Sequence, residues 1–373
     1  MSGCFRFLIR FVCKNAPCRQ AHLRSVMTLM LLTVLLTLSV AQCSMPQRLS
    51  ARVRMARAPV CGMAAKKRSK QAKAAKSKPA ARGFGTYKPK QAVIPSLQLN
   101  TGATLPALCF GTYKLGGEEL KTALQSAIAA GYRHFDTARA YQNENIVGAA
   151  IAESGVSRDD FFLTSKLWGT DHGRERAQQA IEETLAALDT TYLDSLLIHG
   201  PGGNAGRSPE EIVALRQETW LAMEEEHAAG KLRSIGVSNF EPRHIESLLS
   251  CGTVMPAINQ IECHAHLAQA EIRDFCAEHG ILVQAYGSVG ATGLRADPVV
   301  QEIAAAHKRT PAQISLRYTY QSHGACVLAR TLTPRRVAEN AKIFDFELSA
   351  AECAELDARD TGQRSYWDNS EVP

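Results

Sequence analysis

The feature that most constrains the fold is a regular alternation of short apolar segments with amphipathic segments between residues 108 and 329. Short, continuously apolar runs are typical of parallel strands that are covered on both faces. Eight such segments occur in this part of the chain. They lie around Phe110 and Phe135 and at residues 161–166, 194–199, 234–238, 257–260, 282–286 and 326–329.

Helical segments separate the predicted strands. Residues 176–188 place apolar side chains on one face at helical spacing. Thr310 and Pro311 form an N-cap followed by a first-turn proline, and residues 349–352 form a capping box. Strands and helices therefore alternate along almost the whole region.

Eight parallel strands that alternate with helices over about 250 residues are typical of a (β/α)8 barrel, so we predict an α/β fold of the TIM-barrel class. Residues 92–97 and 104–107 flank the turn formers Asn100 and Gly102 and predict a β-hairpin before the first barrel strand. A doubly wound open sheet is the alternative. It usually carries a GxGxxG turn after its first strand, and the glycines here have the wrong spacing.

The basic residues are concentrated at the start of the chain. Residues 1–90 hold 19 of the 43 Lys and Arg, and no Asp or Glu occurs before Glu118. The remainder therefore sets 24 basic side chains against all 36 acidic ones, a net charge of about −12. This distribution argues against nucleic-acid binding by the body of the protein.

Residues 1–90 have the composition of a targeting leader. Basic residues precede an apolar run at residues 26–41, which is typical of a secretory signal, and an Ala-, Lys- and Ser-rich segment without acids follows, as in a transit peptide. Two signals in series predict import into an organelle, such as a plastid wrapped in extra membranes. Secretion, or a membrane anchor at residues 26–41, is the alternative. We therefore divide the chain into a leader, residues 1–90, and a barrel domain, residues 91–373.

Four ionisable residues follow or end the second, third and fourth predicted strands: Asp136, Tyr141, Lys166 and His199. The carboxyl ends of the strands meet at one end of a barrel, so we expect these side chains to form one site. A lysine ammonium is expected to lower the pKa of a neighbouring tyrosine, and an aspartate keeps that lysine charged. A histidine can orient a substrate carbonyl. The set suits proton donation to a carbonyl that receives a hydride.

Six motifs resemble the aldo-keto reductase superfamily, in the same order and across nearly all of residues 95–350. They are GYRHFDTARAYQNE, TSKLW, LLIHGP, IGVSNF, NQIECH and VLARTLTPRRVAEN. The resemblance implies that Asp136, Tyr141, Lys166 and His199 are the catalytic tetrad, with Tyr141 as general acid. It also implies that Ser238, Asn239 and Gln260 hold a nicotinamide carboxamide, that the nicotinamide stacks on Tyr286, and that Gly111 and Thr112 lie near the cofactor.

The same resemblance implies NADPH as the cofactor. The segment that binds the adenosine 2′-phosphate in this family corresponds here to Arg330, Thr331, Arg336, Glu339 and Asn340. Arg330 and Thr331 replace a lysine and a serine of the usual pattern but keep a cation and a hydroxyl. Gly200, Gly287 and Ala329 depart from the family pattern in the loops around the cofactor and the substrate.

The sequence implies less about the substrate pocket than about the cofactor. The resemblance implies that Tyr113, Trp168 and His199 line the substrate pocket, and Trp367 lies where the end of the chain can cover it. The short segment after Asp360 predicts an open pocket that tolerates small aldehydes. The 11 cysteines form no CxxC pair, and Cys263-His264-Ala265-His266 lacks further ligands, so we predict no metal site.

We therefore expect a monomeric NADPH-dependent reductase of aldehydes and ketones, with a small carbonyl compound as its partner and no stable association of the mature body with membranes or nucleic acid. Two alternatives remain open. One is a catalytically weak regulatory subunit that senses NADPH, and the other is an NAD-linked alcohol oxidoreductase, which Arg330 and Arg336 disfavour.

Overall fold

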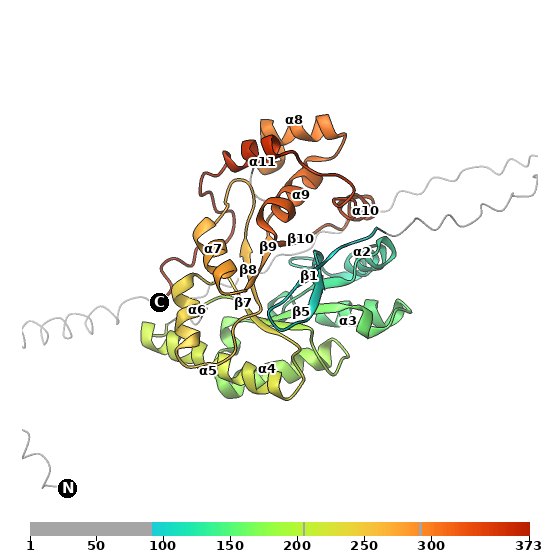
Figure 1. The fold of residues 1–373 in the computed structure, drawn as a ribbon. Helices are drawn as coiled ribbons and strands as arrows, with labels where there is room; N and C mark the ends of the chain where they lie inside the picture. Colours follow the sequence, from blue (N-terminus) through green and yellow to red (C-terminus); the bar gives the residue numbers. More distant parts are fainter. Residues whose placement is uncertain (1–91, 204–205, 291–292) are drawn as a thin grey trace, which may run out of the picture. The chain divides into compact units, whose positions relative to one another are not determined.

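Eight parallel strands close into a barrel in the computed structural model, which describes residues 92–203, 206–290 and 293–373 (Figure 1). Around the barrel the strands follow the order β10-β3-β4-β5-β6-β7-β8-β9. The predicted (β/α)8 fold is confirmed, and the alternative prediction of a doubly wound open sheet is wrong. The barrel strands are β3 (Leu108–Gly111), β4 (His134–Asp136), β5 (Phe162–Leu167), β6 (Ser195–Ile198), β7 (Ile235–Ser238), β8 (Ile258–Glu262), β9 (Leu282–Tyr286) and β10 (Cys326–Ala329).

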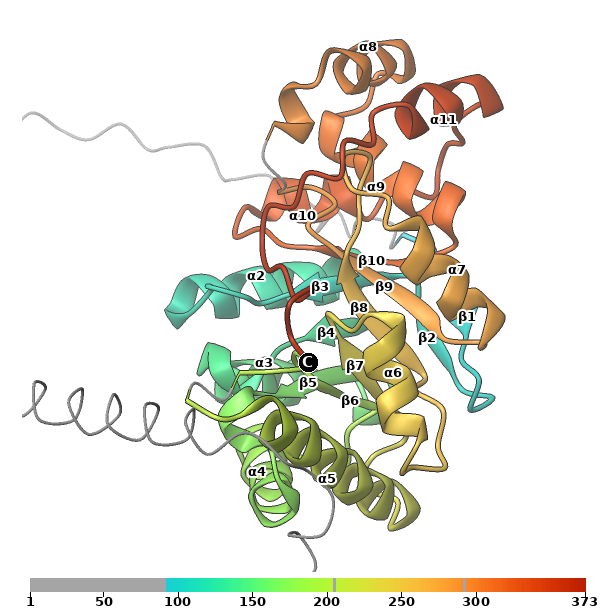
Figure 2. The same cartoon turned by 90° about the vertical axis from the view of Figure 1, so that its left-hand side faces the viewer.

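Helices surround the barrel and cover the outer faces of its strands (Figure 2). Those described are α2 (Gly117–Ala130), α3 (Glu144–Glu153), α4 (Arg174–Ala187), α5 (Pro209–Ala228), α6 (Pro242–Leu249), α7 (Ala270–Glu278), α8 (Pro298–His307), α9 (Pro311–His323), α10 (Pro334–Asn340) and α11 (Ala350–Asp357). Four short 3-10 helices join them to the strands. These are η1 (Arg139–Tyr141), η2 (Arg158–Asp160), η3 (Gly169–Asp171) and η4 (Leu294–Ala296).

Capping residues determine where several helices begin. The Thr310 side chain accepts a hydrogen bond from the backbone N–H of Gln313 at the start of α9, and Ser349 does the same for Glu352 at the start of α11. Both are capping boxes; the sequence predicts the box at Ser349 and an N-cap at Thr310. A third box, at Ser208, begins α5.

The predicted hairpin closes the amino-terminal end of the barrel. Strands β1 (Ser96–Gln98) and β2 (Thr104–Pro106) pair antiparallel, and Leu105 in the middle of β2 is fully buried. Leu105 packs in one apolar cluster with residues that begin barrel strands, Phe162 and Cys326 among them. The hairpin therefore seals the end of the barrel that lies opposite the carboxyl ends of the strands.

Side chains alternate between the barrel interior and the helix layer, as the period of a strand requires. In β5 this alternation places Thr164 and Lys166 on the inner face, and both are fully buried. The apolar cluster around Leu105 lies at the hairpin end of the interior, while the buried polar residues Asp136 and Lys166 lie near the carboxyl ends of their strands.

The leader lies outside the described residues. Its predicted roles as secretory signal, transit peptide or anchor at residues 26–41 stay predictions. Among the residues that the structure describes, every helix is too short or too polar to cross a bilayer.

Gly148 marks a close approach between α3 and the residue that follows α4. A Cβ at this position would overlap the backbone of Leu188 and lie 2.7 Å from its carbonyl carbon. We expect Gly148→Ala to destabilise the protein by about 1–3 kcal/mol, because backbone cannot move aside as a side chain can. Thermal unfolding measures the effect. Gly116→Ala is the control, since Gly116 has extended φ and no atom near its added Cβ, and an equal loss in both variants would contradict the packing argument.

Candidate active site

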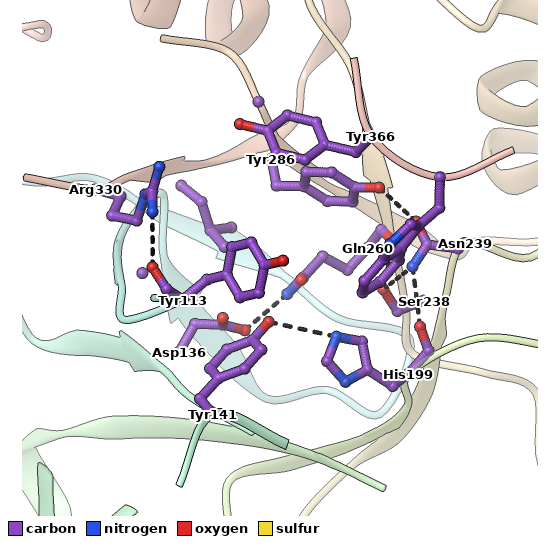
Figure 3. A pocket seen from close by; sticks show the side chains of 14 residues that line it. Tyr113, Asp136, Tyr141, His199, Ser238, Asn239, Gln260, Tyr286, Arg330 and Tyr366 are labelled. Atoms are coloured by element: carbon purple, nitrogen blue, oxygen red, sulfur yellow. Dashed lines mark hydrogen bonds between the residues drawn. The ribbon is translucent and has the colours of Figure 1, made fainter. Parts of the chain in front are cut away.

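The four predicted catalytic side chains meet at the carboxyl ends of the barrel strands. Figure 3 shows three of them, Asp136, Tyr141 and His199. Asp136 is the last residue of β4, Lys166 lies near the end of β5, and His199 directly follows β6. Tyr141 ends the 3-10 helix η1, which follows β4 and turns the ring back over the barrel. The structure thus brings together residues from three strands, as the sequence predicts.

Two members of this cluster, Asp136 and Lys166, form a buried ion pair. The Lys166 Nζ lies 2.6 Å from Asp136 Oδ1, and the two side chains are 0% and 3% exposed. Lys166 also donates to the carbonyl of Thr137 at 2.9 Å, and Asp136 Oδ2 accepts from Gln260 Nε2 at 2.8 Å. A buried pair is tolerated only when its remaining donors and acceptors are satisfied, and these contacts meet that requirement.

Tyr141 is protonated and placed to donate. Its hydroxyl lies 3.3 Å from His199 Nε2 and 3.5 Å from Lys166 Nζ. Burial raises the pKa of Tyr141 well above its ordinary value, and the negative charge of Asp136 adds to the increase. The net shift is therefore upward, opposite to the direction expected from Lys166 alone, because burial and the Asp136 charge dominate.

His199 is held as a neutral ring. Burial lowers the pKa of His199 well below its ordinary value, and the Lys166 charge lowers it further. The ring packs at 5.5 Å from Tyr141, 4.9 Å from Trp168 and 5.3 Å from Trp367, measured between ring centroids. Its Nδ1 has no hydrogen-bond partner among the described residues. A neutral imidazole here can orient a carbonyl without competing as an acid.

A cavity opens beside Tyr141 and His199, and the predicted nicotinamide residues line it. They are joined by hydrogen bonds: Tyr286 donates to Asn239 Oδ1 at 2.7 Å, and Asn239 Nδ2 donates to the carbonyl of His199 at 2.9 Å. Ser238 donates to the carbonyl of Gln260 at 2.8 Å. The predicted residues that line this cavity are Gly111, Tyr113, Asp136, Tyr141, His199, Ser238, Asn239, Gln260, Tyr286 and Arg330.

A second cavity continues from the first along the end of β10 and helix α10. The two share Gly287, Leu328, Arg330 and Tyr366. The predicted phosphate-site residues all line the second cavity, namely Arg330, Thr331, Arg336, Glu339 and Asn340. One continuous groove therefore joins the tetrad to this cluster, which fits an elongated dinucleotide.

The charges at the far end of the groove fit an anion. Glu339 faces Arg335, with 3.5 Å between Oε1 and Nε. Arg336 lines the cavity and makes no ion pair within residues 92–203, 206–290 and 293–373. Arg330 donates to the carbonyl of Tyr113 at 2.8 Å, a neutral partner that leaves its charge uncompensated.

Two of the predicted site residues, Thr112 and Trp168, line neither cavity. Thr112 is fully buried and donates to the carbonyl of Asp136 at 3.0 Å, so its side chain supports the loop after β3 and does not line either cavity. Trp168 lies outside the residues that line the first cavity, but it packs on His199 and Trp367. Trp168 therefore meets the cavity only through the rings of His199 and Trp367.

The end of the chain contributes two aromatic residues to the site. Tyr366 packs edge to face on Tyr286, with 5.5 Å between centroids, and Trp367 packs against both Trp168 and His199. Both line the first cavity and are 37% exposed. The predicted cover by Trp367 is present. The final segment lies along the cavity, and the expectation of an open pocket that tolerates small aldehydes stays a prediction.

Buried side chains anchor this final segment. Glu262, the last residue of β8, accepts hydrogen bonds from the backbone N–H groups of Ser365 and Tyr366 at 2.9–3.1 Å. Further along, Arg216 donates to the carbonyls of Pro201 and Pro373 at 2.9 and 2.7 Å. Sequence reasoning missed both anchors. Glu262 lies within the NQIECH motif, but nothing in the sequence pairs it with residues more than 100 positions away.

The histidines of the Cys263–His266 segment have carboxylate partners. His264 Nε2 lies 2.9 Å from Glu262 Oε1, and His266 Nε2 lies 2.9 Å from Asp297 Oδ2. Among the residues that the structure describes, no group of three or more His, Cys, Asp or Glu is arranged to hold a metal ion.

A parallel barrel with an Asp, Tyr, Lys and His set at its carboxyl ends, opening into a groove for a dinucleotide, defines a barrel oxidoreductase. The chain belongs to the aldo/keto reductase family, whose model matches residues 107–360. Relatives include an aldo-keto reductase of Mycolicibacterium smegmatis, 40% identical over 72% of this chain and 95% of that protein. The glyoxal reductase of Bacillus subtilis is 38% identical over 72% of this chain and 94% of its own length.

Solved structures agree with this membership. The aldose reductase of Schistosoma japonicum superposes with a TM-score of 0.68 at 34% identity and covers 73% of this chain and 94% of that one. An aldo/keto reductase of Brucella melitensis gives a TM-score of 0.67 at 38% identity, over 72% of this chain and all of that one. The protein is thus an oxidoreductase that acts on carbonyl groups, in a family that generally uses nicotinamide cofactors.

Buried neutral histidines predict that stability falls in mild acid. Burial lowers the pKa of His172 to about 4, while an unfolded histidine titrates near 6.5. Between these values the unfolded chain binds more protons, so the free energy of unfolding rises with pH and is fully regained above about 6.5. His244 and His323, each with a pKa of about 4, act in the same direction.

Denaturant unfolding at several pH values between 4 and 7 measures this dependence. His172→Phe tests the contribution of one group, because neither ring nitrogen of His172 has a partner among the described residues. We expect the variant to flatten the slope of stability against pH by about one proton. An unchanged slope would show that His172 is charged in the folded protein.

Proposed function

We propose that this protein reduces aldehydes and ketones to alcohols with NADPH and that Tyr141 is the proton donor. The observation that carries the proposal is the position of the Tyr141 hydroxyl, within 3.5 Å of both His199 Nε2 and Lys166 Nζ at the wall of a cavity. The relatives named glyoxal reductase and aldose reductase support the reaction class.

The groove supports NADPH as the cofactor. Ser238, Asn239 and Gln260 would hold the nicotinamide end beside the Tyr286 ring. Arg330 and Arg336 would hold the phosphate at the other end. NADPH supplies a hydride when it is bound. The preference for NADPH over NADH rests on the two arginines, because a guanidinium matches the oxygens of a phosphate group.

Tyr141, His199 and Lys166 have separate roles in the transfer of a proton to the carbonyl oxygen. Tyr141 stays protonated because its pKa is raised, so it donates a hydrogen bond to the substrate carbonyl oxygen. Neutral His199 orients that oxygen. As the proton moves to the oxygen, the phenolate left on Tyr141 gains the attraction of the Lys166 ammonium. This interaction is stronger in the transition state than in the ground state, and such interactions accelerate the chemical step.

The substrate side favours small or flat carbonyl compounds. Tyr113, Trp168, His199 and Trp367 surround the space beside Tyr141 with aromatic rings. Such walls bury apolar surface and exclude water from the developing charge. We also propose that the protein is a monomer. That it acts in an organelle is a further proposal, which rests on the composition of residues 1–90 alone.

Tyr141→Phe tests the assignment of the acid. We expect the rate of NADPH-dependent aldehyde reduction to fall by at least about 100-fold, since general acid catalysis contributes on that order. The affinity for NADPH should change little, because phenylalanine keeps the ring that packs on Tyr113. Steady-state kinetics and cofactor titration measure the two effects.

Wild-type protein is the reference for that comparison. Undiminished turnover in Tyr141→Phe would contradict the role of Tyr141. Tight NADPH binding by the wild type without turnover of any aldehyde would instead favour a regulatory subunit that senses NADPH.

Arg336→Ala tests the cofactor preference. We expect the KM for NADPH to rise about tenfold while the KM for NADH stays the same, because the lost contact is to the phosphate that only NADPH carries. Lys342→Ala is the control, an exposed cation just beyond α10 that lines neither cavity. Equal effects of Arg336→Ala on both cofactors would contradict a phosphate site here.

A further inference from the structure

A continuous line of hydrogen bonds runs through the barrel interior from the hairpin to the catalytic aspartate. It begins at the carbonyl of Pro106 at the end of β2 and passes through His134, Gln284 and Gln260 to Asp136. All three intervening side chains are at most 3% exposed. Gln260 and Gln284 are also register partners on the neighbouring strands β8 and β9.

The distances along this line are those of hydrogen bonds. His134 Nδ1 lies 3.2 Å from the Pro106 carbonyl oxygen, and His134 Nε2 lies 3.3 Å from Gln284 Nε2. Gln284 Oε1 lies 2.9 Å from Gln260 Nε2, which lies 2.8 Å from Asp136 Oδ2. Thr164 Oγ1 stands 3.1 Å from His134 Nε2 as a second partner.

The groups at the two ends of this line can only accept hydrogen bonds. They therefore determine which atom donates in each hydrogen bond between them. A carbonyl and an ionised carboxylate have no proton to give. Asp136 therefore requires the NH₂ group of Gln260, whose second hydrogen goes to Gln284 Oε1. The Gln284 NH₂ group then faces His134 Nε2, which must accept, while His134 Nδ1–H donates to Pro106. The two ends demand the same arrangement, a neutral His134 protonated at Nδ1.

The charge state of His134 agrees with this arrangement. Burial lowers the pKa of His134 to about 3, so the ring is neutral throughout the physiological range. The line leaves the side-chain amide oxygen of Gln260, Oε1, without a role inside the barrel. Gln260 lines the cavity beside Tyr141, so this oxygen is the part of its amide available to a ligand.

We infer that His134 and Gln284 are positioning residues, which hold the Gln260 amide with its NH₂ on Asp136 and its carbonyl oxygen toward the cavity. Gln260 then serves two groups at once. It stabilises the carboxylate that pairs with Lys166, and it presents an acceptor that selects a donor, such as the NH₂ of a nicotinamide carboxamide. This last statement rests on the proposed function, while the orientation of the amide does not.

The first test needs no variant. In the full-length protein with nitrogen-15-labelled histidine, the ring-nitrogen spectrum should show His134 protonated at Nδ1 and not at Nε2. The signal should stay unchanged between about pH 5 and 8, where an ordinary histidine titrates. Assignment comes from the signal lost in His134→Phe. Protonation at Nε2, or titration in this range, would overturn the inference.

The second test separates positioning from a structural role. We expect Gln284→Met to weaken NADP⁺ binding about tenfold, on the scale of one good hydrogen bond in a buried site. Binding of the 3-acetylpyridine analogue of NADP⁺, which has a methyl in place of the carboxamide NH₂, should change much less. Isothermal titration measures both without requiring turnover. Equal weakening of both ligands, or no change in either, would overturn the inference.

Gln321→Met is the matched control, the same substitution at an amide that bonds to Leu348 between α9 and α11. It should lower the unfolding temperature and leave both affinities unchanged. If wild type binds NADP⁺ but reduces no carbonyl, the proposed function fails while these titrations still decide the role of Gln284. If Gln284→Met does not fold, the histidine spectrum of the wild type decides it.

Discussion

The site depends on one buried ion pair, Lys166 with Asp136. Removing two charges from water costs free energy that their mutual attraction offsets only when every remaining donor and acceptor is paired. The barrel meets this condition with the carbonyl of Thr137 for the lysine and the amide of Gln260 for the aspartate. The pair therefore connects β4, β5 and β8, and its geometry holds only when those strands keep their register.

The two charges of the pair also help to keep both neighbouring groups, Tyr141 and His199, neutral. Burial keeps the Tyr141 phenol protonated and the His199 ring neutral, and the Asp136 charge adds to the first effect while the Lys166 charge adds to the second. The ammonium becomes useful to Tyr141 only when the phenol begins to lose its proton. An arrangement that is nearly neutral at rest and responds to developing charge is what general acid catalysis requires.

The barrel and the tetrad were predictable because their signals are local. Short apolar strands recur at regular intervals, and the ionisable residues lie at strand ends, which a parallel barrel brings together. The final segment was not predictable, because Glu262 meets the backbone of Ser365 and Tyr366, and backbone groups carry no sequence signal. The raised pKa of Tyr141 was also missed, since burial depends on the packed structure and outweighs the nearby cation.

The central claim is that a hydride from NADPH and a proton from Tyr141 reach the two ends of one carbonyl group. Reduction of a simple aldehyde with NADPH carrying deuterium at the transferred position tests this most directly, with mass spectrometry of the product. We expect an alcohol with one deuterium on its former carbonyl carbon and one equivalent of NADPH consumed. An alcohol without the label, or bound NADPH that is never consumed, would contradict it.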